Sequence, residues 1–433
     1  MKIAFLVENF PVVSETFILN QIVGLISRGH EVDIYALQIY GDNSASTSVV
    51  HPDVEKYKLL KRTHYPLQIP QNYLWRLWQG LLLILTNFTK APLPILRSLN
   101  FCKFGKDAVS MRLLYLSIPF LGTPEYDVIH CQFGMHGIAG MKLREIGAIR
   151  GKIITSFRGF DISWYVKQYG ENVYNQLFVK GDLFLANCEF FRQRAISLGC
   201  NPAKIIVHGS GIDCSKFEFR PRHAPKDGKI GIVTTGRLVE KKGIEYAIRA
   251  VAQVAKTYPN LEYKIIGDGE LKAILQQLID ELNMGEKIQL VGWKNQPEII
   301  NIINQSHIFI APSVTAKDGN QDAPVNTLKE AMTMGLPVIG TTHGGIPELV
   351  EEGISGFLVP ERDANAIADK LNYLIENPQV WSTMGEAGRK RVETHYDTNQ
   401  LNEELIKIYQ KLSSQTLDSN HPPLPSSPVT YIS

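Results

Sequence analysis

Three clusters in the second half of the chain combine residue types that suit phosphate and sugar chemistry. The first runs from Gly236 to Gly243, between an apolar run that predicts a strand and a stretch that predicts a helix. Strand–loop–helix order directs free backbone N–H groups at the loop, and Arg237 and Lys242 add fixed positive charge. A diphosphate would fit there, and the alternative is a loop with surface cations. The loop lacks the spacing of an ATPase P-loop.

The second cluster is a pair of acids, Asp322 and Glu330. The residues between them predict a helix start with proline in its first turn: Ala323, Pro324, Val325, Asn326 and Thr327. Were the whole stretch helical, the two acids would lie ~12 Å apart along its axis. Carboxylates accept hydrogen bonds from the vicinal hydroxyls of sugars and ribose. The alternative is that Asp322 caps the helix and Glu330 is solvated or ion-paired.

The third cluster places His343 before Gly344, Gly345 and Pro347. Two glycines allow a backbone to approach a ligand closely. His343 is a candidate base, and a turn position is the equal alternative.

Polar residues also follow the predicted strands of the first half. They are Ser14, Glu15, Thr16, His130, Arg158 and Asp161. Because each set follows a strand, we expect it at the rim of a cleft. The loop after the first strand contains no glycine, which argues against a nicotinamide or flavin enzyme.

These residues are positioned by two series of short apolar runs, which alternate with segments whose apolar spacing predicts helices. The first series predicts strands at 3–7, 31–37, 127–130, 152–156, 183–186 and 204–207. The second predicts strands at 230–234, 262–266, 287–291, 308–311, 337–340 and 357–359. Strand–helix–strand alternation predicts two α/β domains with doubly wound parallel sheets. We expect domains at 1–220 and 230–412, a linker at 221–229, and a disordered tail at 413–433 rich in Ser and Pro. The last helices could cross back to the first domain.

Composition limits the class of protein. The chain has 433 residues, a formal net charge of +2, and five cysteines with no C-x-x-C pair. A dedicated nucleic-acid binder, a disulfide framework and a zinc site are therefore disfavoured. The first residues contain only a five-residue apolar run, and no run reaches the ~18 apolar residues of a membrane span. We expect a cytoplasmic protein.

One segment of the first half departs from this balance. Residues 56–112 contain ten Lys or Arg against one acid, Asp107, interleaved with Trp75 and Trp78. One interpretation is an insert that packs on the first domain with a solvated basic face. The other is an amphipathic surface that rests on an anionic membrane.

Taken in order, the motifs resemble the retaining glycosyltransferases of family 4, which have the two-domain GT-B architecture. The matching segments are SETFILNQIVGLISRGHEV, VHGSGID, GRLVEKKGIEYAI, IIGDGEL, APSVTAKDGNQDAPVNTLKEAMTMGLPVI and GGIPELVEEGISGFLVPERD. The branch that builds bacterial exopolysaccharides of colanic acid and amylovoran type is the most similar. The resemblance is dense over 230–363, weak over 45–125 and absent from the tail.

The resemblance implies a role for each matching position. Arg237 and Lys242 would neutralise the donor diphosphate, Glu330 would hold the ribose hydroxyls, and Asp322 would contact the donor sugar. The implied donor site comprises Gly236, Arg237, Lys242, Gly267, Trp293, Asp322, Ala323, Pro324, Val325, Asn326, Thr327 and Glu330. The implied acceptor side comprises Ser14, Glu15, Thr16, His130, Arg158 and Asp161.

The sequence departs from the family at three places. Asp322 replaces a glutamate, which shortens the side chain by one methylene. Arg158 stands where the family has a histidine at the sugar–acceptor junction, and an arginine cannot take a proton but can stabilise leaving-group charge. The family's H-x-H-F-G reads His130-Cys131-Gln132-Phe133-Gly134.

The expected reaction is transfer of a hexose from a nucleoside diphosphate sugar to a saccharide or lipid-linked saccharide, with retention at the anomeric carbon. Asp322, Glu330, Arg237, Lys242 and Arg158 are the candidate catalytic residues, with no metal and no required cofactor. Alternatives are a sugar-nucleotide epimerase or phosphorylase of the same fold, or a non-catalytic saccharide-binding subunit. We expect no nucleic-acid partner and a place in the cytoplasm, with peripheral contact to the inner face of the plasma membrane through 56–112.

Overall fold

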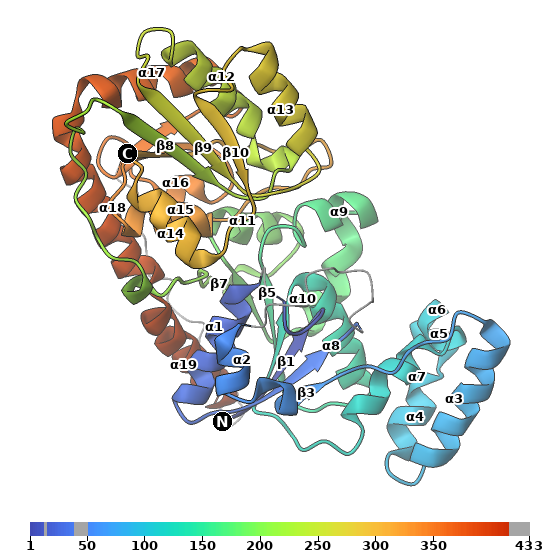
Figure 1. Cartoon of the computed structure of the whole chain (residues 1–433). Helices are drawn as coiled ribbons and strands as arrows, with labels where there is room; N and C mark the ends of the chain where they lie inside the picture. The colour runs from blue at the N-terminus through green and yellow to red at the C-terminus, as the bar shows by residue number, and fades with distance from the viewer. Residues whose placement is uncertain (13–14, 39–50, 415–433) are drawn as a thin grey trace.

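The protein was analysed as a computed structural model, which describes residues 1–12, 15–38 and 51–414. Two parallel sheets form two lobes, with helices on both faces of each (Figure 1). The first sheet has seven strands in the order β3-β2-β1-β4-β5-β6-β7. Their bounds are β1 Lys2–Val7, β2 Glu31–Ala36, β3 Thr63–His64, β4 Val128–Gln132, β5 Lys152–Phe157, β6 Leu183–Ala186 and β7 Ile205–Val207.

The second sheet has six strands in the order β10-β9-β8-β11-β12-β13. Their bounds are β8 Ile230–Thr235, β9 Leu261–Ile266, β10 Ile288–Gly292, β11 Ile308–Ala311, β12 Val338–Thr341 and β13 Gly356–Val359. In both sheets the strand order reverses beside the first strand of the series. Such a switch point opens a crevice at the carboxyl ends of the strands, where α/β proteins bind ligands. The predicted α/β class and all twelve predicted strands are confirmed, each within two residues at either end.

Helices cover both faces of each sheet, so central strands are apolar throughout. Strand β1 shows this, because every residue from Ile3 to Val7 is fully buried. The helices of the first lobe are α1 Thr16–Ser27, α2 Pro52–Lys56, α8 Gly134–Ile146, α9 Trp164–Tyr169, α10 Asn175–Lys180 and α11 Glu189–Ser197. Those that follow β8 are α12 Ile244–Val254, α13 Lys272–Glu281, α14 Gln296–Asn304, α15 Asn326–Thr333, α16 Ile346–Leu349, α17 Ala364–Glu376, α18 Trp381–Tyr396 and α19 Thr398–Ser414.

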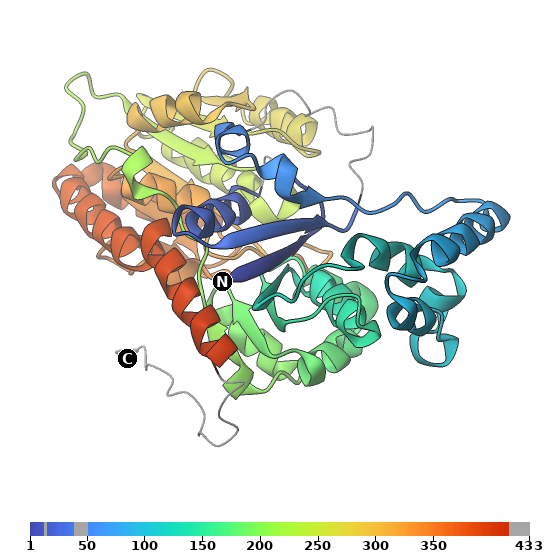
Figure 2. The ribbon, with the colours of Figure 1, turned by 90° about the horizontal axis from the view of Figure 1, so that it is seen from below.

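The chain passes between the lobes twice, at neighbouring points. On the way out, Ile212, Cys214 and Phe217 already pack in the core of the second lobe. On the way back, Asp397 pairs with Ile212 in a short parallel bridge, and α19 then crosses to the first lobe (Figure 2). There Leu405 joins the core formed by α1 and β1. We therefore propose a domain boundary near Gly211 instead of the predicted linker at 221–229, because the buried Arg222 bonds the Asn304 and Met334 carbonyls of the second lobe.

The predicted insert 56–112 divides into two parts. Its beginning belongs to the sheet lobe, since Leu59 is buried in the α1–β1 core and β3 extends the sheet. The rest projects to one side in both views (Figures 1 and 2). We call residues 66–112 the outgrowth, which contains α3 Tyr73–Asn87, α4 Pro92–Ser98, α5 Phe101–Phe104 and α6 Lys106–Val109. Helix α7, Arg112–Ser117, joins it to the lobe.

Helix α19 ends at Ser414, so the first two residues of the predicted disordered tail are helical. The remaining residues of that tail, 415–433, lie outside the described part of the chain. Among the described residues, no helix combines the length and the apolar character needed to cross a membrane.

Candidate active site

The carboxylate of Asp322 is held by two lysines where β11 leads toward α15. Its Oδ1 lies 3.0 Å from Lys241 Nζ and its Oδ2 lies 2.7 Å from Lys242 Nζ. Ser313 Oγ donates a third bond, at 3.0 Å, to Oδ2. Burial by itself would raise the pKa of Asp322, but Lys242 and Lys241 hold it well below its usual value. Burial also lowers the pKa of Lys242, against the opposing effect of Asp322. Asp322 is thus an ionised acid in a cationic corner.

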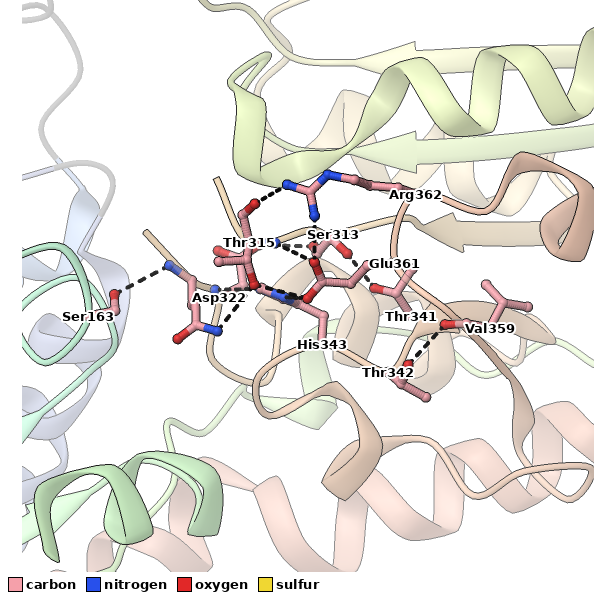
Figure 3. A network of polar contacts seen from close by, with 11 residues as sticks. Ser163, Ser313, Thr315, Asp322, Thr341, Thr342, His343, Val359, Glu361 and Arg362 are labelled. Carbon is pink, nitrogen blue, oxygen red and sulfur yellow. Dashed lines mark hydrogen bonds and ion pairs between the residues drawn. The ribbon is translucent and has the colours of Figure 1, made fainter. Parts of the chain in front are cut away.

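His343 fixes the backbone of Asp322. The Asp322 N–H donates to His343 Nε2 at 2.9 Å, so the ring proton lies on Nδ1, which donates to Glu361 Oε1 at 2.6 Å (Figure 3). Glu361 also accepts from the Thr315 N–H at 2.8 Å. With both nitrogens occupied and the ring buried, His343 acts as an orienting residue. Sequence reasoning missed Glu361, whose role depends on a contact eighteen residues away along the chain.

The two glycines after His343 pack closely on the segment that carries Asp322 and Pro324. A Cβ on Gly344, whose φ is +52°, would collide with the carbonyl oxygen of Asp322. A Cβ on Gly345 would collide with the ring of Pro324. The glycines therefore let this loop pack tightly on the segment that carries Asp322, and their approach to a ligand stays a prediction.

The loop after β8 forms the other wall of the cationic corner. Lys242 lies against Gly236, where an added Cβ would meet its side-chain carbons at 3.5 Å. Gly267, with φ +143°, packs against the Gly236 carbonyl so closely that a Cβ would collide with it. Arg237 is exposed and, within the described residues, has no ion-pair partner. Its charge lowers the pKa of Lys242, so Arg237 adds a third cation to the corner where two lysines hold the Asp322 carboxylate.

Helix α15 begins later than the sequence predicts. Its first residue is Asn326 and its N-cap is Val325, which makes no side-chain cap bond. Pro324 therefore precedes the first turn, and Asp322 does not cap the helix. The ~12 Å separation assumed a continuous helix and does not apply. The ring of Pro324 packs closely on Gly345, and the backbone is extended at Val325, just before the helix begins.

The other residues of this segment bind protein groups. Thr327 Oγ1 donates to the Thr235 carbonyl at 2.9 Å, and Asn326 Oδ1 accepts from Lys329 Nζ at 3.1 Å. Val325 is buried in the core of the second lobe, whereas Ala323 packs against the core of the first. The segment therefore links the lobes directly beside the cationic corner.

Glu330 lies on α15 with its carboxylate unused. No described residue forms a hydrogen bond or ion pair with it, which excludes the ion-paired alternative for that part of the chain. Burial raises its pKa to about 7, partly offset by the charge of Lys329. A partly buried carboxylate with free acceptor oxygens suits hydroxyl groups of a ligand. The other predicted donor-site residue, Trp293, lies after β10 and is exposed.

A buried lysine that the sequence analysis did not single out ties the lobes together. Lys329 is fully buried, and its Nζ donates to the Ser210 carbonyl at 2.7 Å and lies 4.7 Å from the ring centre of Tyr396. Ser210 lies where the chain first passes between the lobes, and Tyr396 lies just before it passes back. Lys329 therefore contacts both crossing segments. Burial lowers the pKa of Lys329 to about 7.

We expect the lysine to make stability rise with pH. Between pH 7 and the unfolded pKa near 10.4, the unfolded chain binds more protons at this site. The free energy of unfolding should therefore rise across that range by up to about 1.4 kcal/mol per pH unit. The Lys329→Met variant should lack this rise, whereas Lys407→Met, at an exposed position of α19, should keep it. Denaturant unfolding of the three proteins at pH 7 to 10 measures the free energy of unfolding. The prediction is wrong if this free energy changes with pH in the same way in Lys329→Met as in the unchanged protein.

Arg158 is enclosed in the first lobe at the end of β5. Its Nε and Nη2 donate to Gln132 Oε1 at 3.0 and 2.7 Å, and its Nη1 donates to Ser210 Oγ at 2.8 Å. The ring of Phe17 covers the guanidinium, with its centre 4.4 Å away. Burial lowers the pKa of Arg158 to about 10, so the group stays cationic. We propose that Arg158 positions the lobe crossing through Ser210.

Two other predicted acceptor-side residues also bind protein groups. His130 is fully buried between Tyr409 Oη, 2.5 Å from Nδ1, and Ser156 Oγ, 2.7 Å from Nε2. Burial lowers its pKa well below the usual value, so the ring is neutral. The Asp161 carboxylate accepts from the N–H groups of Gly134 and Arg158 at 2.7 and 2.9 Å. Both residues therefore support the strand ends.

The remaining acceptor-side prediction concerns the start of α1. Glu15 is the N-cap residue, and burial raises its pKa to about 7. Thr16 begins the helix and is exposed. Ser14 lies outside the described residues.

A groove of about 1090 Å³ lies between the lobes, and its lining includes Gln321 and Gly344 but not the cations of the corner or Asp322. Helices α9 and α11 of the first lobe line one wall, and residues 315–321 and 344–348 of the second line the other. Glu348 accepts the first two N–H groups of α11, from Glu189 and Phe190, at 2.7 and 2.8 Å. The groove is large enough for a sugar-sized ligand.

Two α/β lobes with parallel sheets that face each other are the architecture of the GT-B class of glycosyltransferases. Family models agree: residues 14–216 match Glycosyltransferase Family 4, and residues 215–391 match Glycosyl transferases group 1. The chain belongs to this glycosyltransferase family.

Its relatives include two proteins of bacterial polysaccharide synthesis. The putative colanic acid biosynthesis glycosyltransferase WcaL of Salmonella typhimurium is 36% identical over 95% of this chain and 100% of its own. The amylovoran biosynthesis glycosyltransferase AmsK of Erwinia amylovora is 34% identical with the same coverage. Among solved structures, Anabaena HepE in complex with UDP and glucose has a TM-score of 0.68 at 18% identity, over 95% of this chain and 100% of that one. That similarity supports the GT-B fold.

Proposed function

We propose that the protein transfers a hexose from a nucleoside diphosphate sugar to a saccharide acceptor in exopolysaccharide synthesis, with retention of the anomeric configuration. The cationic corner, where Lys241 and Lys242 hold the Asp322 carboxylate and the charge of Arg237 acts on Lys242, is the observation that carries the proposal. Its relatives named for colanic acid and amylovoran synthesis support the polysaccharide product. We assign the donor site as predicted from the sequence, with Glu330 facing the ribose and Asp322 facing the sugar.

The corner would stabilise the leaving diphosphate. As the bond to the anomeric carbon breaks, negative charge develops on the phosphate, and preorganised cations lower the energy of that state. An oxygen of the departing phosphate would take the acceptor proton, so no enzyme base is required at Arg158. The lobes would exclude water from the groove and favour transfer over hydrolysis.

Lys242 must serve two anions in this scheme. In the free protein it pairs with Asp322 at 2.7 Å. Lys241 holds the other oxygen of that carboxylate, so Asp322 would keep one partner when Lys242 turns to a phosphate. The shared arrangement would keep the acid ionised and ready to accept a bond from a sugar hydroxyl.

We propose that no metal ion is needed, since the fixed cations of the corner would themselves neutralise the diphosphate. We also propose a lipid-linked acceptor and peripheral contact with an anionic membrane at the inner face of the plasma membrane. The basic composition of residues 56–112 supports that contact.

A donor screen tests the proposal. Thermal unfolding of the full chain with a panel of UDP- and GDP-sugars should show one or a few donors that raise the midpoint, because ligands that bind only the folded state stabilise it. The selected donor should release its nucleoside diphosphate slowly by hydrolysis, at the same rate with and without EDTA. A panel that shifts nothing and releases nothing would refute the proposal, and loss of turnover in EDTA would refute its metal-free form.

A further inference from the structure

The outgrowth carries an apolar surface that the fold leaves uncovered. Of the 25 exposed large apolar side chains in the described residues, 16 lie between residues 60 and 109. Those on the helices of the outgrowth are Tyr73, Leu74, Trp75, Trp78, Leu81, Leu82, Leu85, Leu93, Leu96, Phe101 and Val109. Soluble proteins rarely expose apolar side chains in such a group without a partner.

Helix α3 is apolar on two sides, and only one of them packs against the rest of the described chain. Its inner side, at Leu77, Gly80 and Ile84, packs on a small cluster around Met111. Its outer side repeats apolar residues at helical spacing: Leu74, Trp78, Leu81 and Leu85, with Leu74 75% and Leu85 72% exposed. A helix that is apolar on both sides needs cover on both sides.

The outgrowth also carries positive charge. Lys90, Arg97, Lys106 and Arg112 are exposed and, within the described residues, have no ion-pair partner. The one acid of the outgrowth, Asp107, is neutralised by Lys142 at 2.6 Å. An apolar face on a basic outgrowth suits the acyl chains and anionic headgroups of a lipid surface. A second copy of the chain would instead bring these cations against one another.

We propose that the outgrowth docks the enzyme on an anionic bilayer, with α3 lying flat in the interface. Fifteen residues of helix span about 22 Å, too short to cross a bilayer but suited to lie within its surface. Trp75 and Trp78 stack with ring centres 5.1 Å apart on the outer side, and tryptophan is enriched at membrane interfaces. This inference rests on the proposed membrane contact but not on the proposed sugar transfer.

The outgrowth is fastened to the lobe, so docking would orient the whole molecule. Tyr115 Oη, on the joining helix α7, donates to the Arg76 carbonyl of the outgrowth at 2.9 Å. The ion pair of Asp107 with Lys142 links it to α8, which begins at the end of β4. Docking would thus set the height of the groove above the lipid.

Vesicle sedimentation of the full chain tests the proposal. Binding to phosphatidylcholine vesicles with about one-third phosphatidylglycerol should exceed binding to pure phosphatidylcholine at least about tenfold at low salt. A triple variant, Leu74→Glu, Leu81→Glu and Leu85→Glu, should lose at least about tenfold of that binding. Ile274→Glu, an exposed apolar site on α13, should bind within about twofold of the unchanged protein. Equal binding of the triple variant, or none by the unchanged protein, would overturn the proposal.

A second readout separates lipid contact from self-association. Brominated lipids should quench the tryptophan emission of the unchanged protein, and Trp75→Phe with Trp78→Phe should abolish that quenching. Sedimentation velocity should show the same mass for the unchanged protein and the triple variant. A dimer that the triple variant dissolves, without vesicle binding, would instead assign the face to a second copy. Donor hydrolysis in solution should be unchanged in the triple variant, so failure of sugar transfer would be seen separately.

Discussion

Lys242→Ala should lower kcat/KM for the donor by about 10²- to 10³-fold, the usual cost of removing one preorganised charge from a transition state. The side chain lies at the cationic corner, with its ammonium 2.7 Å from Asp322 and its stem against Gly236. Its loss removes a cation from the leaving phosphate. It also leaves Asp322 with Lys241 as its one remaining lysine partner, so the pKa of Asp322 should rise.

Lys241→Ala is the matched control, because Lys241 holds the same carboxylate at 3.0 Å. If the effect arises from Asp322 losing a partner, the two variants should fail equally. If Lys242 binds phosphate, kcat/KM should fall far more in Lys242→Ala than in Lys241→Ala. In Lys242→Ala the affinity for the nucleoside diphosphate should also fall more than the affinity for the monophosphate. Calorimetric titration of both nucleotides measures this, and unchanged diphosphate affinity in Lys242→Ala would end the phosphate role.

Glu330→Gln should raise the donor KM about 10- to 100-fold at pH 8, as expected for losing charged hydrogen bonds to hydroxyl groups. Burial raises the pKa of Glu330 to about 7, so the carboxylate is ionised above that pH and protonated below it. Donor affinity of the unchanged protein should therefore fall as pH falls through 7, approaching tenfold per unit. The glutamine variant should show no such fall.

Lys329 supplies the control for this pH profile. Its charge lowers the pKa of Glu330, although its own pKa is lowered to about 7 by burial. The Lys329→Met variant should therefore still lose donor affinity as the pH falls, but the loss should begin at a higher pH. Donor KM measured from pH 5.5 to 8.5 in the three proteins checks both effects. If donor KM depends on pH in the glutamine variant as it does in the unchanged protein, Glu330 does not contact the donor.

The fold could be predicted from the sequence because its signals are local. Continuous apolar runs such as 3–7 and 308–311 are typical of strands buried on both faces, and their alternation with helical text predicts parallel sheets. The candidate donor residues Arg237, Lys242 and Asp322 could be singled out because they lie in loops that follow strands β8 and β11. The outgrowth was recognised as unusual by composition, but composition could not say which of its faces is covered.

What the sequence determined by itself, then, is the order of strands and helices and the identity of the charges that could meet a sugar nucleotide. Tertiary structure alone decided their partners. Lys242 meets Asp322 across 80 positions of chain, His343 orients the Asp322 backbone instead of acting as a free base, and Lys329 joins both crossings between the lobes. The physical reason is distance: periodicity reports only neighbours within a few residues, whereas an ion pair or a buried hydrogen bond depends on which distant segments the packed core brings together.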